Sequence, residues 1–202
     1  MSKNLLIIFT RNPELGKVKT RLAKSVGDQT ALEIYQFLLN KTKEVTQGLA
    51  CDKAIFYSEE ITQNDIWDRN LYKKYVQFGS DLGGKMESAF KVGFEKNYKK
   101  ILIIGSDLYD LEASYINEAF EKLDSSDVVI GPALDGGYYL IGLKKVTPKI
   151  FKNKNWGTSS VRKETMKDLE EVDVHLLPIL NDVDIIEDIE HHPAFTKFLK
   201  TS

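Results

Sequence analysis

Residues 101–107 read Ile-Leu-Ile-Ile-Gly-Ser-Asp, and this stretch decides the fold class. Its four aliphatic residues form the most apolar of the predicted strands, and the glycine that follows ends the run abruptly. A strand that is apolar on both faces is typical of the middle of a parallel sheet whose two faces are covered by helices. The stretch therefore predicts a central strand that ends just before Asp107.

On both sides of this strand, short apolar runs alternate with segments of helical spacing. Further strands are predicted at residues 5–10, 54–57, 75–78, 127–130, 138–143 and 174–177. Helices are predicted from residue 28, after the capping residue Asp81, and at residues 112–123, 160–171 and 193–199. Because this alternation is typical of βαβ units, we expect one α/β domain over residues 1–202, a three-layer sandwich with a mostly parallel central sheet.

The overall composition argues against several classes of protein. The chain has 28 basic and 30 acidic residues and a formal charge of -2, so nothing draws it generally to nucleic acid or anionic lipid. The single Cys51 has no internal disulfide partner, and no apolar run is long enough to span a membrane. We therefore expect a cytoplasmic protein without a nucleic-acid partner or a membrane span.

The first candidate site is the loop after the first strand, where four cations surround a glycine: Arg11, Gly16, Lys17, Lys19 and Arg21. Ligands of open α/β sheets bind beyond the carboxyl ends of the strands, and phosphates there need positive charge and exposed backbone N–H groups. The loop lacks the glycine spacing and the following Ser or Thr of a Walker A loop. It is either a phosphate-binding loop or a solvated basic surface.

Acidic residues after the central strand and near the end of the chain form the second candidate site. Asp107 follows the central strand directly, and its carboxylate suits Mg²⁺ or Mn²⁺ shared with substrate phosphates, although a turn aspartate explains it equally well. Asp182-Val183-Asp184 places two carboxylates on one side of an extended segment. This pair either completes a metal site or forms an acidic turn.

The third candidate is Asp135-Gly136-Gly137-Tyr138, between two predicted strands. The glycines are turn formers, but they also allow a sugar or acceptor to approach the backbone, with Asp135 accepting hydrogen bonds from its hydroxyls. Trp156, in a glycine-containing loop, is a further candidate for acceptor contact. Structural and functional explanations have equal weight here.

Taken together, five segments resemble one family. They are PELGKVKTRL (13–22), DLGGKM (81–86), GSDL (105–108), GPALDGGYY (131–139) and DVD (182–184). The chain resembles the bacterial group of small glycosyltransferase-A-like proteins formerly of unknown function, also called radical-SAM and selenodomain-associated transferase 1. The resemblance spans nearly the whole chain.

This resemblance implies a nucleotide-diphospho-sugar transferase fold. It also implies that Lys17, Lys19 and Arg21 lie near the donor phosphates, and that Asp107 and Asp184 hold a divalent metal.

The chain departs from the family pattern at three positions. Tyr109 stands where Pro is usual, Ile185 where Thr is usual, and Lys85 where Arg is usual. Lys85 keeps the charge expected near the phosphates but not the bidentate geometry of a guanidinium group.

The function expected from these features is metal-dependent transfer from a nucleotide-activated donor, most simply a nucleotide-diphospho-sugar, to an unidentified acceptor. Asp135 would orient or deprotonate the acceptor. A nucleotidyltransferase that releases pyrophosphate from a nucleoside triphosphate is the alternative. The substitutions at Tyr109 and Ile185 leave open a non-catalytic domain that binds nucleotide sugars.

Overall fold

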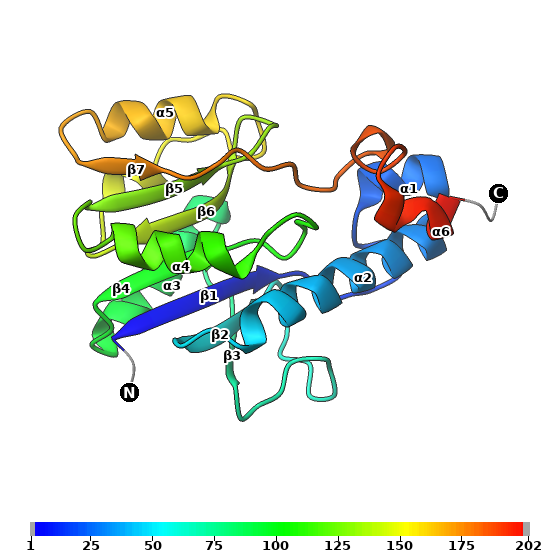
Figure 1. The fold of residues 1–202 in the computed structure, drawn as a ribbon, viewed down its shortest axis with the longest axis horizontal. Helices are drawn as coiled ribbons and strands as arrows, with labels where there is room; N and C mark the ends of the chain where they lie inside the picture. Colours follow the sequence, from blue (N-terminus) through cyan, green and yellow to red (C-terminus); the bar gives the residue numbers. More distant parts are fainter. Residues whose placement is uncertain (1–2, 200–202) are drawn as a thin grey trace.

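The computed structural model describes residues 3–199, and within them a seven-stranded sheet lies between layers of helices (Figure 1). The strands are β1 Asn4–Thr10, β2 Asp52–Tyr57, β3 Tyr72–Val76, β4 Lys100–Ile104, β5 Val128–Pro132, β6 Tyr138–Leu143 and β7 Val174–Leu176. The α-helices are α1 Thr20–Val26, α2 Asp28–Gln47, α3 Leu82–Glu95, α4 Ala113–Lys122, α5 Val161–Asp168 and α6 Thr196–Leu199. Short 3-10 helices are η1 Pro148–Phe151, η2 Ile186–Asp188 and η3 Pro193–Phe195. The predicted fold class is confirmed.

The sheet has the strand order β3-β2-β1-β4-β6-β5-β7, which puts β4 in the middle as predicted. Only β6 runs antiparallel to its neighbours within the described sheet. Alternate residues of β4 enter different cores, because successive strand side chains point to opposite faces. Leu102 and Ile104 pack with residues of α2 and α4, and Ile101 and Ile103 pack with residues of α3 and η1.

One edge of the sheet gathers the loops that carry the predicted site residues. β1 and β4 are parallel neighbours, so the loops after Thr10 and Ile104 leave the sheet side by side. β6 runs the other way and pairs Leu140 with Ile104, so residues 133–137, which precede β6, lie at the same edge. This carboxyl edge is where open α/β sheets bind ligands.

The C-terminal segment crosses this carboxyl edge. After β7 it exchanges backbone hydrogen bonds with the β5–β6 region, and then the Val183 N–H donates to the Asp107 carbonyl oxygen at 3.0 Å. Val183 is buried in a third core with Leu22 of α1 and Ile34 of α2. Figure 1 shows the orange and red part of the chain running from β7 to α1 and α6, beyond the end of β1.

Two predicted elements differ from the structure. Residues 20–26, which were predicted to be loop, form the short helix α1, and Gly27 with φ 82° separates it from α2. A helix with one buried residue, Leu22, carries too little periodicity to be recognised from its pattern. The edge strand β3 begins at Tyr72, earlier than predicted, because the buried Tyr72 side chain anchors it, whereas Phe78 is 80% exposed.

None of the helices within residues 3–199 is both long enough and apolar enough to cross a membrane.

Candidate functional site

The centre of the site is an ion pair between the basic loop and the residue that follows β4. The Lys19 ammonium nitrogen lies 2.9 Å from Asp107 Oδ2, and the Lys19 side chain is only 7% exposed. Lys19 is the N-cap of α1 and has a left-handed backbone, with φ 47° and ψ 43°. This conformation is uncommon for a residue other than glycine, and such residues cluster at functional sites.

The segment 182–184 adds further carboxylates around Lys19. Burial lowers the pKa of the Lys19 ammonium, but attraction to Asp107, Asp184 and Asp182 exceeds this effect and raises the pKa above its ordinary value. Arg21 Nη1 lies 2.5 Å from Asp184 Oδ2. Two of the cations predicted to bind the donor phosphates, Lys19 and Arg21, therefore form ion pairs with the two carboxylates predicted to bind the metal, Asp107 and Asp184.

Asp182 is the carboxylate most affected by its surroundings. Burial, followed by repulsion from Asp107 and Asp135, raises its pKa to about 6. Asp135 of the β5–β6 loop therefore belongs to the same electrostatic environment as Asp107. We refer to Lys19, Asp107, Asp135 and Asp182, together with the pair Arg21–Asp184, as the edge cluster.

The edge cluster offers hard oxygen ligands of the kind that Mg²⁺ and Mn²⁺ prefer. Within residues 3–199, no three acidic, histidine or cysteine side chains are already arranged to enclose a metal ion. That geometry still fits a nucleotide-bridged Mg²⁺, which usually takes only one or two carboxylates and completes its shell with substrate phosphates and water. Asp107 and either Asp182 or Asp184 would hold such an ion once Lys19 or Arg21 moves away.

A buried network of hydroxyl groups connects α2 to the loops that follow β1 and β4. The Tyr35 hydroxyl of α2 lies 3.1 Å from Thr10 Oγ1 and 3.2 Å from Ser106 Oγ, and it accepts the Arg11 N–H at 2.8 Å. Asn12 is buried as well, and its side-chain amide donates to the Glu60 carbonyl oxygen at 2.9 Å. These contacts fix the start of the basic loop between β1, β4 and the segment after β2.

The remaining predicted phosphate ligands lie farther out. Lys17 is exposed and pairs with Glu14 at 2.7 Å, a contact that raises the pKa of Lys17. Gly16 has φ 74° and forms the turn that precedes Lys17. The Arg11 side chain and Lys85 of α3 form no ion pair with any described residue.

The glycine loop before β6 has an evident structural purpose. Asp135 Oδ1 accepts the Gly137 N–H at 2.7 Å, which closes the turn and leaves the other carboxylate oxygen without a described partner. Gly136 has φ 92°, and a Cβ placed there would lie 2.3 Å from the Ser159 carbonyl oxygen. The close approach that Gly136 permits is therefore to the backbone of Ser159.

Tyr138 and Trp156 lie together beside α3. Their rings are perpendicular, with centroids 6.5 Å apart, and a Cβ at Gly83 would lie 2.6 Å from the Trp156 ring. Burial raises the pKa of Tyr138. The Tyr138 hydroxyl and Trp156 Nε1 are buried without a hydrogen-bond partner among residues 3–199.

The structure also explains one departure from the family pattern and adds residues that sequence reasoning passed over. Tyr109 packs on Phe37, Phe195 and His192, and so joins the loop after β4 to the C-terminal helices. Tyr35 and Asn12 were not predicted as site residues, yet Tyr35 accepts the Arg11 N–H at the start of the basic loop, and Asn12 within that loop bonds to Ser58. Asp182 was predicted only as one of the pair with Asp184, and it lies near Asp107 and Asp135. Tyr35 keeps the helical spacing of a core residue, so its sequence context gave no signal for its hydroxyl.

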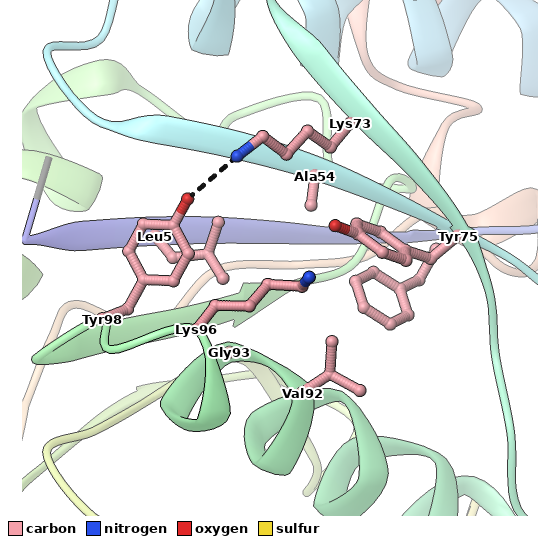
Figure 2. Close-up of a pocket in the computed structure, with 9 residues that line it drawn as sticks. Leu5, Ala54, Lys73, Tyr75, Val92, Gly93, Lys96 and Tyr98 are labelled. Carbon is pink, nitrogen blue, oxygen red and sulfur yellow. Dashed lines mark hydrogen bonds between the residues drawn. The ribbon is translucent and has the colours of Figure 1, made fainter. Parts of the chain in front are cut away.

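A small cavity near the opposite edge of the sheet is not part of this site. It measures about 10 Å³, room for about one water molecule, and it adjoins Leu5 near the start of β1 (Figure 2). The Lys73 ammonium group donates to the Tyr98 hydroxyl at 3.4 Å, and the Lys96 ammonium lies 5.9 Å from the Tyr75 ring centroid. A cavity of this size has no room for a ligand larger than a water molecule.

Several solved structures are similar to this chain. A solved structure from Desulfovibrio desulfuricans, described as a candidate nucleotide-diphospho-sugar transferase, has a TM-score of 0.88 and 30% identity, over 99% of this chain and 95% of that one. A cytidylyltransferase from Leptospira borgpetersenii shares the fold, with a TM-score of 0.58 and 15% identity over 94% of this chain and 84% of that one. A Mycobacterium tuberculosis protein in complex with manganese shares the fold too, with a TM-score of 0.53 and 10% identity over 100% of both chains.

No curated protein sequence matches this chain. Residues 41–158 match the bacterial family described as "Uncharacterized protein conserved in bacteria (DUF2064)". This match covers more than half of the chain, and the relative at 30% identity extends along nearly all of it. The chain therefore belongs to the DUF2064 family and has the fold of nucleotide-diphospho-sugar transferases.

Proposed function

We propose that this chain is a metal-dependent transferase that uses a nucleotide-activated donor, and that the donor is a nucleotide-diphospho-sugar. The observation that carries the proposal is the edge cluster, where the buried ammonium of Lys19 contacts Asp107 at the carboxyl edge of the sheet. A relative at 30% identity, described as a candidate nucleotide-diphospho-sugar transferase, supports the choice of donor.

The mechanism follows from what each side chain can do. Asp107 would hold the divalent metal, whose contribution would be to neutralise the charge that builds on the departing diphosphate. Lys19, released from Asp107, and Arg21, released from Asp184, would then contact the diphosphate oxygens, which have become the nearest anions. The binding of donor and metal is therefore expected to rearrange both ion pairs.

Asp135 is the proposed base. Its Oδ1 is committed to the Gly137 N–H, which fixes the carboxylate and leaves the second oxygen to accept an acceptor hydroxyl proton. As the acceptor oxygen bonds to the anomeric carbon, the carbon–oxygen bond to the diphosphate breaks. The nucleoside diphosphate leaves with the electron pair, and Asp135 takes the proton.

A donor screen tests this function directly. Nucleotides and nucleotide sugars are tested by thermal shift with and without Mn²⁺, because a ligand that binds only the folded state raises its melting temperature. The donors that bind are then incubated with a panel of acceptors. We expect Mn²⁺-dependent stabilisation that is lost in Asp107→Ala, together with free nucleoside diphosphate as product. Unchanged metal binding in Asp107→Ala would contradict the site assignment.

The second candidate is nucleotidyl transfer. The fold shared with the Leptospira cytidylyltransferase favours it, and the cations of the basic loop would suit a triphosphate nearly as well as a diphosphate. Here an acceptor phosphate would attack the α-phosphate, so the released product would be pyrophosphate instead of nucleoside diphosphate. A non-catalytic binding domain is indicated if donors bind with Mn²⁺ and neither product is formed.

A further inference from the structure

A second charged site lies away from the edge cluster, in a groove between η1 and α5. The groove has a volume of about 430 Å³. Its charged lining residues are Lys149, Lys152, Lys154, Lys167, Glu164 and Asp168. This volume is within the usual range of small-molecule sites, about 300–1,000 Å³, and the lining carries more positive than negative charge.

The carboxylates of the groove are already engaged. Lys154 is only 4% exposed and forms an ion pair with Asp168, and its ammonium group also donates to the Lys152 carbonyl oxygen at 3.3 Å. Glu164 accepts a hydrogen bond from the Ser160 hydroxyl at 2.7 Å. The buried Lys154–Asp168 pair therefore forms a fixed, neutral part of the wall.

The other lysines have no such partner. Lys149, Lys152 and Lys167 are exposed, and none of them forms an ion pair with a residue in the described part of the chain. They converge on one groove from η1, the following loop and α5. Exposed lysines that share one groove repel one another, and an anion between them removes this repulsion.

The sequence sets this region apart from the rest of the chain. Residues 144–167 contain eight basic residues and one acidic residue, whereas the whole chain has a net charge of -2. Four of these basic residues line the groove, so the local excess of positive charge favours anions there.

The groove is also separate from the edge cluster. Arg162 at the start of α5 donates its backbone N–H to the Gly136 carbonyl oxygen, so this end of the helix meets the Asp135 loop. Asp168 lies at the other end, about 9 Å farther along the helix axis at 1.5 Å per residue. In Figure 1, α5 lies well away from α1 and α6.

We propose that the groove between η1 and α5 is an anion-binding site for a soluble phosphorylated small molecule, distinct from the donor site. A phosphate group presents several strong acceptor oxygens, and lysine ammonium groups bind phosphate as compact point charges with freely rotating donors. Trp156 lies in the loop between η1 and α5, two residues after the groove-lining Lys154, and serves as a natural fluorescent reporter for this loop.

The experiment uses Trp156 as that reporter. Trp67→Phe removes the other tryptophan, which is buried against Tyr72 elsewhere in the fold. In this background, inorganic phosphate and glycerol 3-phosphate are titrated at constant ionic strength. We expect a saturable change in Trp156 emission. The substitutions Lys149→Gln, Lys152→Gln and Lys167→Gln, made together, should weaken binding at least tenfold.

Two controls make the result specific. Lys3→Gln, Lys99→Gln and Lys122→Gln, made together, remove the same charge from exposed positions outside the groove, and we expect affinity to stay within twofold. Lys19→Met should also leave it unchanged, since Lys19 belongs to the edge cluster. The proposal is overturned if neither probe gives a saturable signal, if the control triple variant loses as much affinity, or if Lys19→Met abolishes the signal. Nucleotide binding in the thermal-shift screen is measured separately, so failure of the groove and failure of the proposed transferase function are distinguishable.

Discussion

The substitution Lys19→Met tests the idea that Lys19 occupies the place of a metal ion in the free protein. Unit charges 2.9 Å apart attract each other by about 6 kcal/mol at an effective dielectric constant of about 20. Desolvation of the ammonium group offsets much of this attraction, and methionine keeps the apolar stem packed. Removing one partner of a fully buried pair costs about 3–5 kcal/mol. Because Asp107 is 36% exposed and regains water, we expect a loss of about 2 kcal/mol.

Differential scanning fluorimetry measures the effect. For a chain of this size, about 2 kcal/mol corresponds to a fall of about 4–8 °C in melting temperature. Addition of Mn²⁺ should stabilise Lys19→Met more than the unsubstituted protein, because the metal no longer has to displace an ammonium group from Asp107. The same variant should bind a nucleotide-sugar donor more weakly, since Lys19 is then absent from the phosphate site.

Lys17→Met is the matched control. It removes the same charge from the same loop, but Lys17 is exposed and pairs with Glu14 and Glu59 rather than with Asp107. We expect its response to Mn²⁺ to equal that of the unsubstituted protein. If Mn²⁺ stabilises Lys19→Met no more than Lys17→Met, then Lys19 and the metal do not compete for the same carboxylates, and the reasoning is refuted.

Other regions yield further predictions. Asp65→Ala should cost about 3–5 kcal/mol by urea denaturation, since it strands the buried Lys74 ammonium 2.6 Å away, and a loss below about 1 kcal/mol would contradict this account. Gly136→Ala should cost about 2 kcal/mol or more in the same assay, because φ is 92° and the new Cβ meets Ser159; a neutral result would mean that the turn readily shifts. Burial raises the pKa of Cys51 from 9.0 to about 11, so alkylation at pH 8 should be about a hundredfold slower in the folded than in the unfolded chain. The thiol therefore favours folding below pH 9, and this contribution disappears as pH rises through 11; equal alkylation rates would contradict the shift.

The sequence predicts the sheet well because hydrophobic pattern and strand order act together. An apolar run such as 101–104 must be covered on both faces, and this alone places β4 in the centre. The same topology brings the loops after Thr10 and Ile104 to one edge, so the proximity of the basic loop to Asp107 follows from strand order. Helix α1 escapes recognition because so short a segment buries only Leu22.

The pairing of individual charges is harder to predict from the chain. The alternation in residues 182–184 indicates that both carboxylates leave the same side of the backbone, but it does not say which neighbour each one meets. Burial of Val183 in the core with α1 and α2 fixes the segment, and Arg21 then reaches Asp184 while Asp182 is left nearer Asp107 and Asp135. The contact between Lys19 and Asp107 joins residues 88 positions apart, which no local pattern encodes.

These contacts bear on the order in which the proposed donor and metal would bind. In the free protein Lys19 and Arg21 neutralise Asp107 and Asp184, while burial, followed by repulsion from Asp107 and Asp135, raises the pKa of Asp182 to about 6. A diphosphate that arrived alone would draw the cations away and leave carboxylates facing phosphates, an arrangement disfavoured by like-charge repulsion. A metal that arrived alone would have to displace the buried ammonium of Lys19. When donor and metal bind together, the metal neutralises the carboxylates that the donor has deprived of their cations, and the donor phosphates pair with the cations that the metal has displaced. The two affinities are therefore coupled, and each ligand should strengthen the binding of the other.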